Sequence, residues 1–202
     1  GFTIKHLKSD FKLTPQMMEF KNLDIQTGGS HLEDYYAMTY QDFQEDMGDF
    51  TDKVHIKARF KNASVSSNDI AYFAPELKDW KKQFKIAGSM QGTVSNFKAR
   101  NFFISGSGGM VLKGDLAMKG LPDIEHTVMD FDTLDLHTNY NQILPIVPGL
   151  KEIKNPNFAA LGDMHYSGNF HGTVYDFTTR GSLSTALGGS QAKHHLQIQD
   201  KE

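Results

Sequence analysis

The chain has 202 residues, of which 39% are hydrophobic and 22% charged, a composition typical of a globular protein rather than a disordered or collagenous one. Lys and Arg number 21 against 24 Asp and Glu, so the formal charge of −3 offers no basic field for nucleic acid, which we do not expect as a partner. Cysteine is absent, which excludes thiol nucleophiles, cysteine zinc sites and iron–sulfur clusters.

Alternating apolar residues predict β-strands with one dry face along most of the chain. In chain order we expect strands near residues 54–60, 84–94, 110–118, 129–140, 166–174 and 180–187. Turn signals separate them at residues 28–29, 106–109, 120–122 and 188–189. Within residues 129–140 the apolar side chains change from odd to even positions at Asp132 and Thr133, which predicts a β-bulge there.

One short helix is predicted over residues 69–84, where apolar residues recur every three to four positions. Pro75 limits its length. We expect this helix to connect two strands and to cover a sheet end. The alternative, a helix that touches a membrane, is less favoured because its polar side is not strongly basic.

A repeat of 80 residues organises the sequence. Residues 88–100 align with 168–180 at six identical positions, and Val54, Ile56 and Phe60 precede Leu134, Leu136 and Tyr140 by the same interval. Residues 72–78 resemble 145–151 at an interval of 73, so the connections differ in length. We therefore expect one continuous array: residues 1–62 as the tail of one unit, 63–142 as a full unit and 143–202 as the head of the next.

Motifs for catalysis or metal binding are weak. The nine histidines are spread at about one per strand, without HExxH spacing, and we expect them to be exposed strand residues. Asp130, Asp132 and Asp135 resemble a calcium loop superficially, but Asp135 stands where such loops require glycine. The sequence therefore predicts no enzyme, no cofactor and no metal site.

The unusual content of 15 Phe, 7 Tyr and 9 Met leaves two interpretations open. In a closed β-sandwich these residues would fill the core, whereas in an open curved sheet they would line a groove suited to flexible acyl chains. Composition alone favours the closed core.

Several segments resemble the periplasmic part of TamB-type translocation and assembly module proteins, in the version found in Bacteroidota. They are residues 88–97, 113–125, 161–162, 168–172, 176–177 and 183–188, within a matching region of about 66–198; Gly120-Leu-Pro-Asp123 is the most specific run. TamB-type proteins belong to the AsmA-like group, which is similar to bridge-like lipid transfer proteins. The chain would then be an internal fragment of a longer protein.

The resemblance implies a mainly β fold: an elongated, curved antiparallel sheet, or β-taco, with a hydrophobic concave face. It implies a periplasmic protein that is anchored in the inner membrane through an N-terminal segment absent here and that carries phospholipids between the inner and outer membranes in outer-membrane biogenesis. The alternative is a scaffold or chaperone segment for outer-membrane protein translocation, assembly and secretion. That role would use β-augmentation with an Omp85-type barrel, which docks through regions outside this fragment.

The residues expected to line the groove and contact lipid share an apolar side chain in an alternating segment. They are Val54, Ile56, Phe60, Phe84, Ile86, Met110, Leu112, Leu116, Met118, Leu134 and Leu136. Since a sheet of this kind has open edges, we also expect the isolated chain to form edge-to-edge homodimers.

Overall fold

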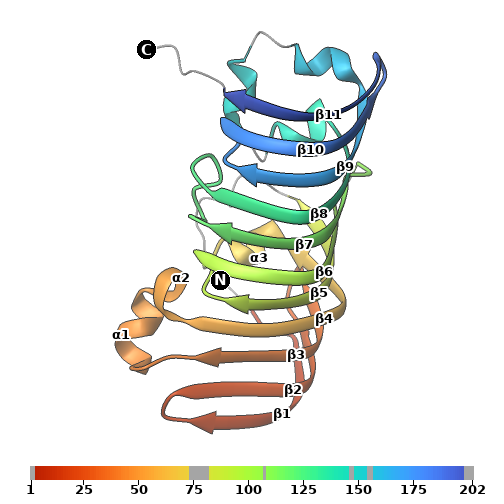
Figure 1. Cartoon of the computed structure of the whole chain (residues 1–202). Helices are drawn as coiled ribbons and strands as arrows, with labels where there is room; N and C mark the ends of the chain where they lie inside the picture. The colour runs from red at the N-terminus through yellow and green to blue at the C-terminus, as the bar shows by residue number, and fades with distance from the viewer. Residues whose placement is uncertain (1–2, 73–81, 107, 146–147, 154–156, 198–202) are drawn as a thin grey trace.

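The computed structural model describes residues 3–72, 82–106, 108–145, 148–153 and 157–197. It confirms the predicted class: the chain forms one curved, unclosed antiparallel sheet of 11 strands that follow each other in sequence order (Figure 1). The strands are β1 (His6–Thr14), β2 (Met17–Gln26), β3 (His31–Thr39), β4 (His55–Ser66), β5 (Gln83–Gly92), β6 (Asn96–Gly106), β7 (Val111–Lys119), β8 (Val128–Asn139), β9 (Asp163–Gly172), β10 (Asp176–Thr185) and β11 (Gly188–Gln197).

Short helices occupy the connections, where one helix was expected. They are α1 (Phe43–Gly48), α2 (Phe50–Lys53), α3 (Ser67–Ile70), α4 (Tyr140–Ile143) and the 3₁₀ turns η2 (Pro148–Lys151) and η3 (Phe158–Leu161). The helix predicted over residues 69–84 is wrong at its end, because Phe84 lies in β5; residues 73–81 lie outside the described part. The alternation of the apolar Phe84 and Ile86 with the polar Gln83 and Lys85 favoured a strand over the helix that the apolar spacing predicts.

The strand positions reproduce most of the sequence repeat. β3, β5 and β6 begin 80 residues before β7, β9 and β10, whereas β4 begins 73 residues before β8. Residues 40–54 join β3 to β4, and the equivalent connection, residues 120–127, is seven residues shorter. Ile56 and Met129 therefore occupy equivalent places, opposite Gly92 and Gly172, so the expected match of Ile56 with Leu136 is wrong. The division of the chain into three units stays a prediction.

The repeated Gly-Thr pair builds the same turn in two hairpins. Gly92 and Gly172 have φ of +133° and +130°, and an added Cβ would lie 2.3 and 2.2 Å from a carbonyl oxygen across each turn. The hydroxyls of Thr93 and Thr173 each accept a hydrogen bond of 3.1 Å from the backbone N–H three residues on. The repeat thus preserves residues that the turn geometry requires.

β-Bulges bend the sheet into its curve. The predicted bulge is confirmed, because Phe131 lies opposite Leu116 and Thr133 opposite Asp115, which leaves Asp132 unpaired. Similar register shifts interrupt every neighbouring pair from β1–β2 to β8–β9. Since each bulge bends its strand and increases the local twist, this series accounts for a strongly curved sheet.

Candidate functional site

The concave face carries apolar side chains in rows that run across the strands. Residues directly opposite each other in neighbouring strands share a face, so the pairing register links them in line. The first row crosses all 11 strands: Leu13, Met18, Met38, Ile56, Gly92, Phe97, Met118, Met129, Gly172, Phe177 and Leu196. It contains no charged residue, and its two glycines come from the repeat.

Two further rows widen this lining. The second row, from β1 to β9, comprises Phe11, Phe20, Tyr36, Ala58, Met90, Ala99, Leu116, Phe131 and Phe170. The third, from β5 to β10, comprises Ile86, Ile104, Leu112, Leu136, Tyr166 and Leu183. We call the surface formed by these three rows the trough. Ten steps between strands of about 4.8 Å each make its first row roughly 48 Å long.

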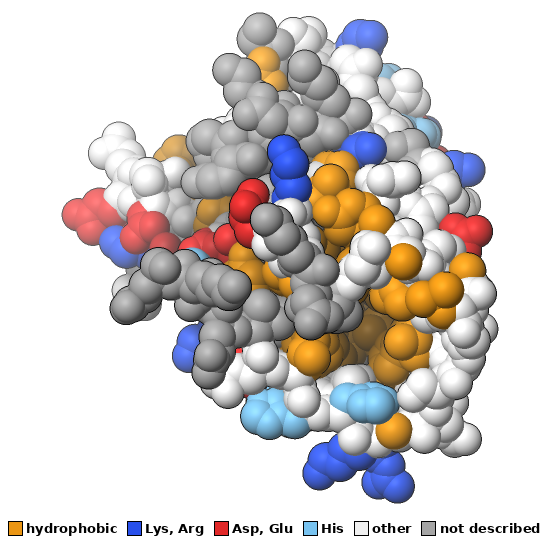
Figure 2. Space-filling model, turned by 90° about the horizontal axis from the view of Figure 1, so that it is seen from above, with side chains coloured by type: hydrophobic (Ala, Val, Ile, Leu, Met, Phe, Trp, Pro, Cys, Tyr) orange, Lys and Arg blue, Asp and Glu red, His pale blue; other side chains and the backbone are white. Residues whose placement is uncertain are grey.

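The trough is hollow and partly uncovered. Viewed along the stack of strands, hydrophobic side chains gather inside the curve, and many of the Lys, Arg and His side chains lie toward the rim of the view (Figure 2). A hollow of about 970 Å³ lies beside α1 and α2, with Phe20, Tyr36 and Met38 among its lining. On β1 the side chains of Phe11 and Leu13 remain 54% and 58% exposed. Contiguous exposed apolar surface is one of the features of ligand grooves and interaction surfaces.

The structure divides the predicted lipid-contacting residues into two groups. Buried residues are Val54, Ile56, Phe84, Met110, Leu116 and Leu134, of which Leu116 and Leu134 pack with Ala99 and Phe131 in the core cluster. Partly exposed residues are Phe60, Ile86, Leu112, Met118 and Leu136. Only the second group presents surface that a ligand can touch without displacing other side chains. Contact of any of these residues with lipid stays a prediction.

Sequence reasoning missed the parts of the trough formed by β1, β2, β3, β6 and β11. In β2 the inward residues change from Met18 and Phe20 to Leu23, and the bulge between them contains Asn22 at a φ of +51°. In β6 the bulge at Asn101, with a φ of +48°, has the same effect. Asparagine adopts a positive φ more readily than most residues, so Asn22 and Asn101 were the available sequence signal of these two bulges.

Ion pairs reinforce the convex face, on the other side of the sheet. The guanidinium of Arg59 donates to both carboxylate oxygens of Asp34, at 2.6 and 3.0 Å, and Arg100 donates to Asp115 at 2.8 Å. The hydrogen bond from Arg59 lowers the pKa of Asp34 below its ordinary value of 3.8, although partial burial opposes the shift. The hydrogen bond from Arg100 and one from the backbone N–H of Asn101 likewise lower the pKa of Asp115.

We expect the Asp34 ion pair to stabilise the fold at neutral pH but not in strong acid. Because the pKa of Asp34 is lower in the folded state, its contribution is complete above the unfolded value and is lost as the pH falls through the folded value. Asp34→Asn keeps a residue that tolerates the φ of +102° at this position. The variant should therefore unfold at a lower temperature than the wild type at pH 7, and this difference should shrink as the pH is lowered into the strongly acidic range. A difference that is equal at neutral and at strongly acidic pH would contradict this.

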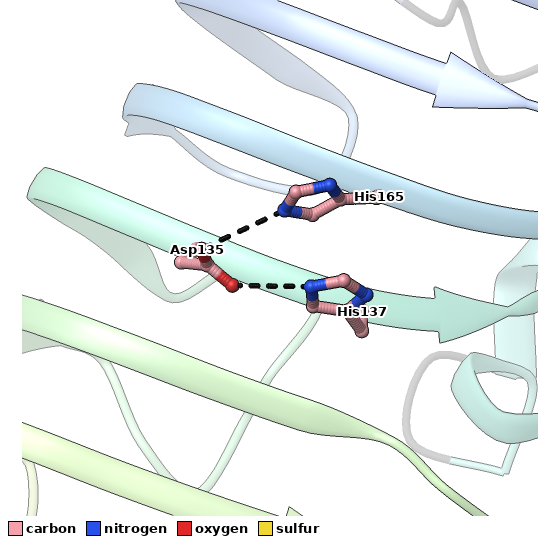
Figure 3. Close-up of side chains that lie close together, drawn as sticks. All are labelled: Asp135, His137 and His165. Atoms are coloured by element: carbon pink, nitrogen blue, oxygen red, sulfur yellow. Dashed lines mark ion pairs between the residues drawn. The ribbon is translucent and has the colours of Figure 1, made fainter.

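One group of three metal-ligating side chains comes together within the described ranges. Asp135 and His137 of β8 and His165 of β9 place one ligand atom each within 4.8 Å of one another (Figure 3). The sequence predicts exposed strand histidines and no metal site, and it does not indicate this group. Asp135 and His137 are two residues apart in one strand, so they lie on one face of the sheet. His165 reaches them only because β9 pairs with β8, and residues 140–162 separate these two strands in the sequence.

No helix in the described part of the chain has both the length and the apolar character needed to cross a bilayer. The chain matches no protein-family model, no curated protein and no solved structure in the three comparisons made. The trough and the side chains around it are therefore the basis for the function proposed below.

Proposed function

We propose that this chain is a periplasmic segment of an envelope-biogenesis protein whose trough carries phospholipids between the inner and outer membranes. The observation that carries the proposal is the first apolar row, which crosses all 11 strands without a charged residue. In this proposal the acyl chains lie against the rows, and the headgroups remain in water at the open side of the curve.

The physical chemistry of the rows suits a cargo that must move. Burial of each CH₂ group of an acyl chain contributes about 0.8 kcal/mol, so a chain held along the trough is well shielded from water. Similar apolar positions recur at every strand. A lipid that moves along the trough by one strand therefore replaces its contacts with equivalent ones, and its acyl chains need not be exposed to water on the way. Met18, Met38, Met118 and Met129 add flexible, polarizable contacts that adapt to chains of different length.

The resemblance of residues 88–97 and 113–125 to TamB-type proteins supports the same role. It supplies the proposed setting: anchoring in the inner membrane by a segment outside this chain, and partnership with an Omp85-type barrel. The shape of the sheet is compatible with the β-taco implied by that resemblance.

A second candidate is a scaffold for outer-membrane proteins, which would accept a client strand by β-augmentation. It is favoured by one observation: among the described strands, β1 and β11 each pair on one side only. Lys8 and Lys12 on β1 are charges of the kind that discourages unspecific strand addition. In this candidate the backbone of an edge strand, rather than the apolar rows, would hold the partner.

Binding of a phospholipid with a fluorescent acyl chain to the purified chain tests the proposal. We expect a saturable rise in fluorescence as the probe leaves water, reversed by unlabelled phospholipid. Glycerophosphocholine, which carries the headgroup without acyl chains, should not compete. Absence of saturable binding, or equal competition by glycerophosphocholine, would contradict binding through the apolar rows.

A further inference from the structure

We infer that Asp135, His137 and His165 form a binding site for a divalent transition-metal cation of the Zn²⁺ type on the convex face. All three project from the side of the sheet opposite the trough: Asp135 and His137 alternate with the inward residues Leu134, Leu136 and Thr138 along β8. His165 lies directly opposite His137 in the neighbouring strand.

The distances fit a shared ion. Oδ1 of Asp135 lies 3.5 Å from Nε2 of His137, and Oδ2 lies 3.6 Å from Nε2 of His165 (Figure 3). Tetrahedral zinc with bonds of about 2.0–2.1 Å separates its ligand atoms by roughly 3.3 Å, so only a small approach is needed. The two imidazole rings are stacked, with centroids 3.8 Å apart and planes at 14°. A rotation about the soft terminal torsion of the rings would direct both lone pairs at the ion.

His165 gives an independent reason to expect a ligand. Its Nε2 is shielded from solvent and has no hydrogen-bond partner among the described residues, and no other side-chain nitrogen or oxygen within those ranges shares that condition. Oδ2 of Asp135, 3.6 Å away, is too distant to hydrogen-bond this nitrogen, and a cation bound between the two atoms would satisfy both.

The donor set indicates which cations fit. Two imidazole nitrogens and one carboxylate oxygen suit Zn²⁺, Ni²⁺ or Cu²⁺ rather than Mg²⁺ or Ca²⁺, which prefer oxygen ligands alone. A hollow of about 620 Å³ adjoins both histidines, and Ser184 and Gln142 are in its lining. It leaves room for a water molecule at the fourth position of a tetrahedral ion.

The site lies at the pair of neighbouring strands that are furthest apart in the sequence, where a cross-link would stabilise the pairing most. β8 and β9 are neighbours in the sheet, yet residues 140–162 separate them in sequence, the longest connection between paired strands. An ion held by Asp135 and His137 on β8 and by His165 on β9 would fasten this junction from the outside. It would leave the trough on the inner side free.

Calorimetric titration of the chain with ZnCl₂ tests the inference. We expect one ion per chain, with an affinity at least about tenfold weaker in His137→Ala, in His165→Ala and in the nearly isosteric Asp135→Asn. The melting temperature should rise with Zn²⁺ in the wild type and rise less in these variants at the same Zn²⁺ concentration.

His171→Ala is the matched control. His171 also lies on the convex face of β9 beside an aspartate, with Nδ1 3.6 Å from Asp130, but the pair offers two ligands rather than three. This variant should bind Zn²⁺ as the wild type does. The inference is overturned if the wild type does not bind Zn²⁺, if His171→Ala weakens binding as much as His165→Ala, or if binding persists unchanged in all three site variants.

Discussion

Replacement of Leu112 and Leu136 by asparagine is expected to weaken phospholipid binding by at least about tenfold while the sheet remains folded. The two residues lie opposite each other in the third row and are partly exposed in the trough. Without lipid, water can hydrate both amides. An acyl chain over them would remove that water, at a cost of about 1–3 kcal/mol for each amide left without a partner, and 1.4 kcal/mol corresponds to a tenfold change in affinity.

Lys85→Asn with Lys113→Asn is the matched control for this double variant. Each lysine is the chain neighbour of an inward residue and therefore points to the convex face. The control should bind the fluorescent phospholipid as the wild type does, and circular dichroism should show intact sheet in both variants. If Leu112→Asn with Leu136→Asn unfolds the chain, these side chains form a closed core. If the folded variant binds lipid normally, they do not contact it.

Gly114→Ala is expected to destabilise the chain by more than about 3 kcal/mol. Gly114 in β7 has a φ of +144°, and an added Cβ would lie only 1.6 Å from the carbonyl oxygen of Thr133. Thr133 is part of the bulge in β8, so the backbone cannot retreat without breaking the pairing of β7 with β8. Two penalties therefore combine, an unfavourable backbone conformation and an overlap with backbone atoms. Urea denaturation measures the loss.

Two other glycines separate these penalties. Gly28 has no atom within 4 Å of an added Cβ and no positive φ, so Gly28→Ala should change stability by less than about 0.5 kcal/mol. Gly188 has equal space but a φ of +133°, so Gly188→Ala should show the conformational penalty alone, about 1–3 kcal/mol. A loss below 1 kcal/mol for Gly114→Ala would mean that β7 and β8 do not pair as described.

The sequence predicts the class of fold because apolar and polar residues alternate wherever a strand is free of bulges. It locates β4, β5 and most of β7 to β10, and at Asp132 and Thr133 it reveals a bulge, because clear alternation flanks the shift on both sides. It fails at β2 and β6, where bulges at Asn22 and Asn101 divide each strand into stretches too short to show a period of two.

The candidate sites were less predictable because they depend on register. The apolar rows exist only once every strand is aligned with its neighbours; a slip of one residue would turn Leu112 away from Leu136. The cluster of Asp135, His137 and His165 likewise requires the pairing of β8 with β9, which residues 140–162 do not reveal. Single-strand patterns determine which face is dry. They do not determine which residues from different strands meet.

Photo-crosslinking in cells tests the lipid-carrying trough most directly. A benzophenone side chain would replace Leu112, which faces the trough, or its neighbour Lys113, which faces outward, in the intact protein, and the adducts would be analysed for phospholipid. We predict phospholipid adducts at position 112 and none at position 113. Protein adducts, or no adducts, at position 112 would contradict a lipid-filled trough and favour the scaffold instead.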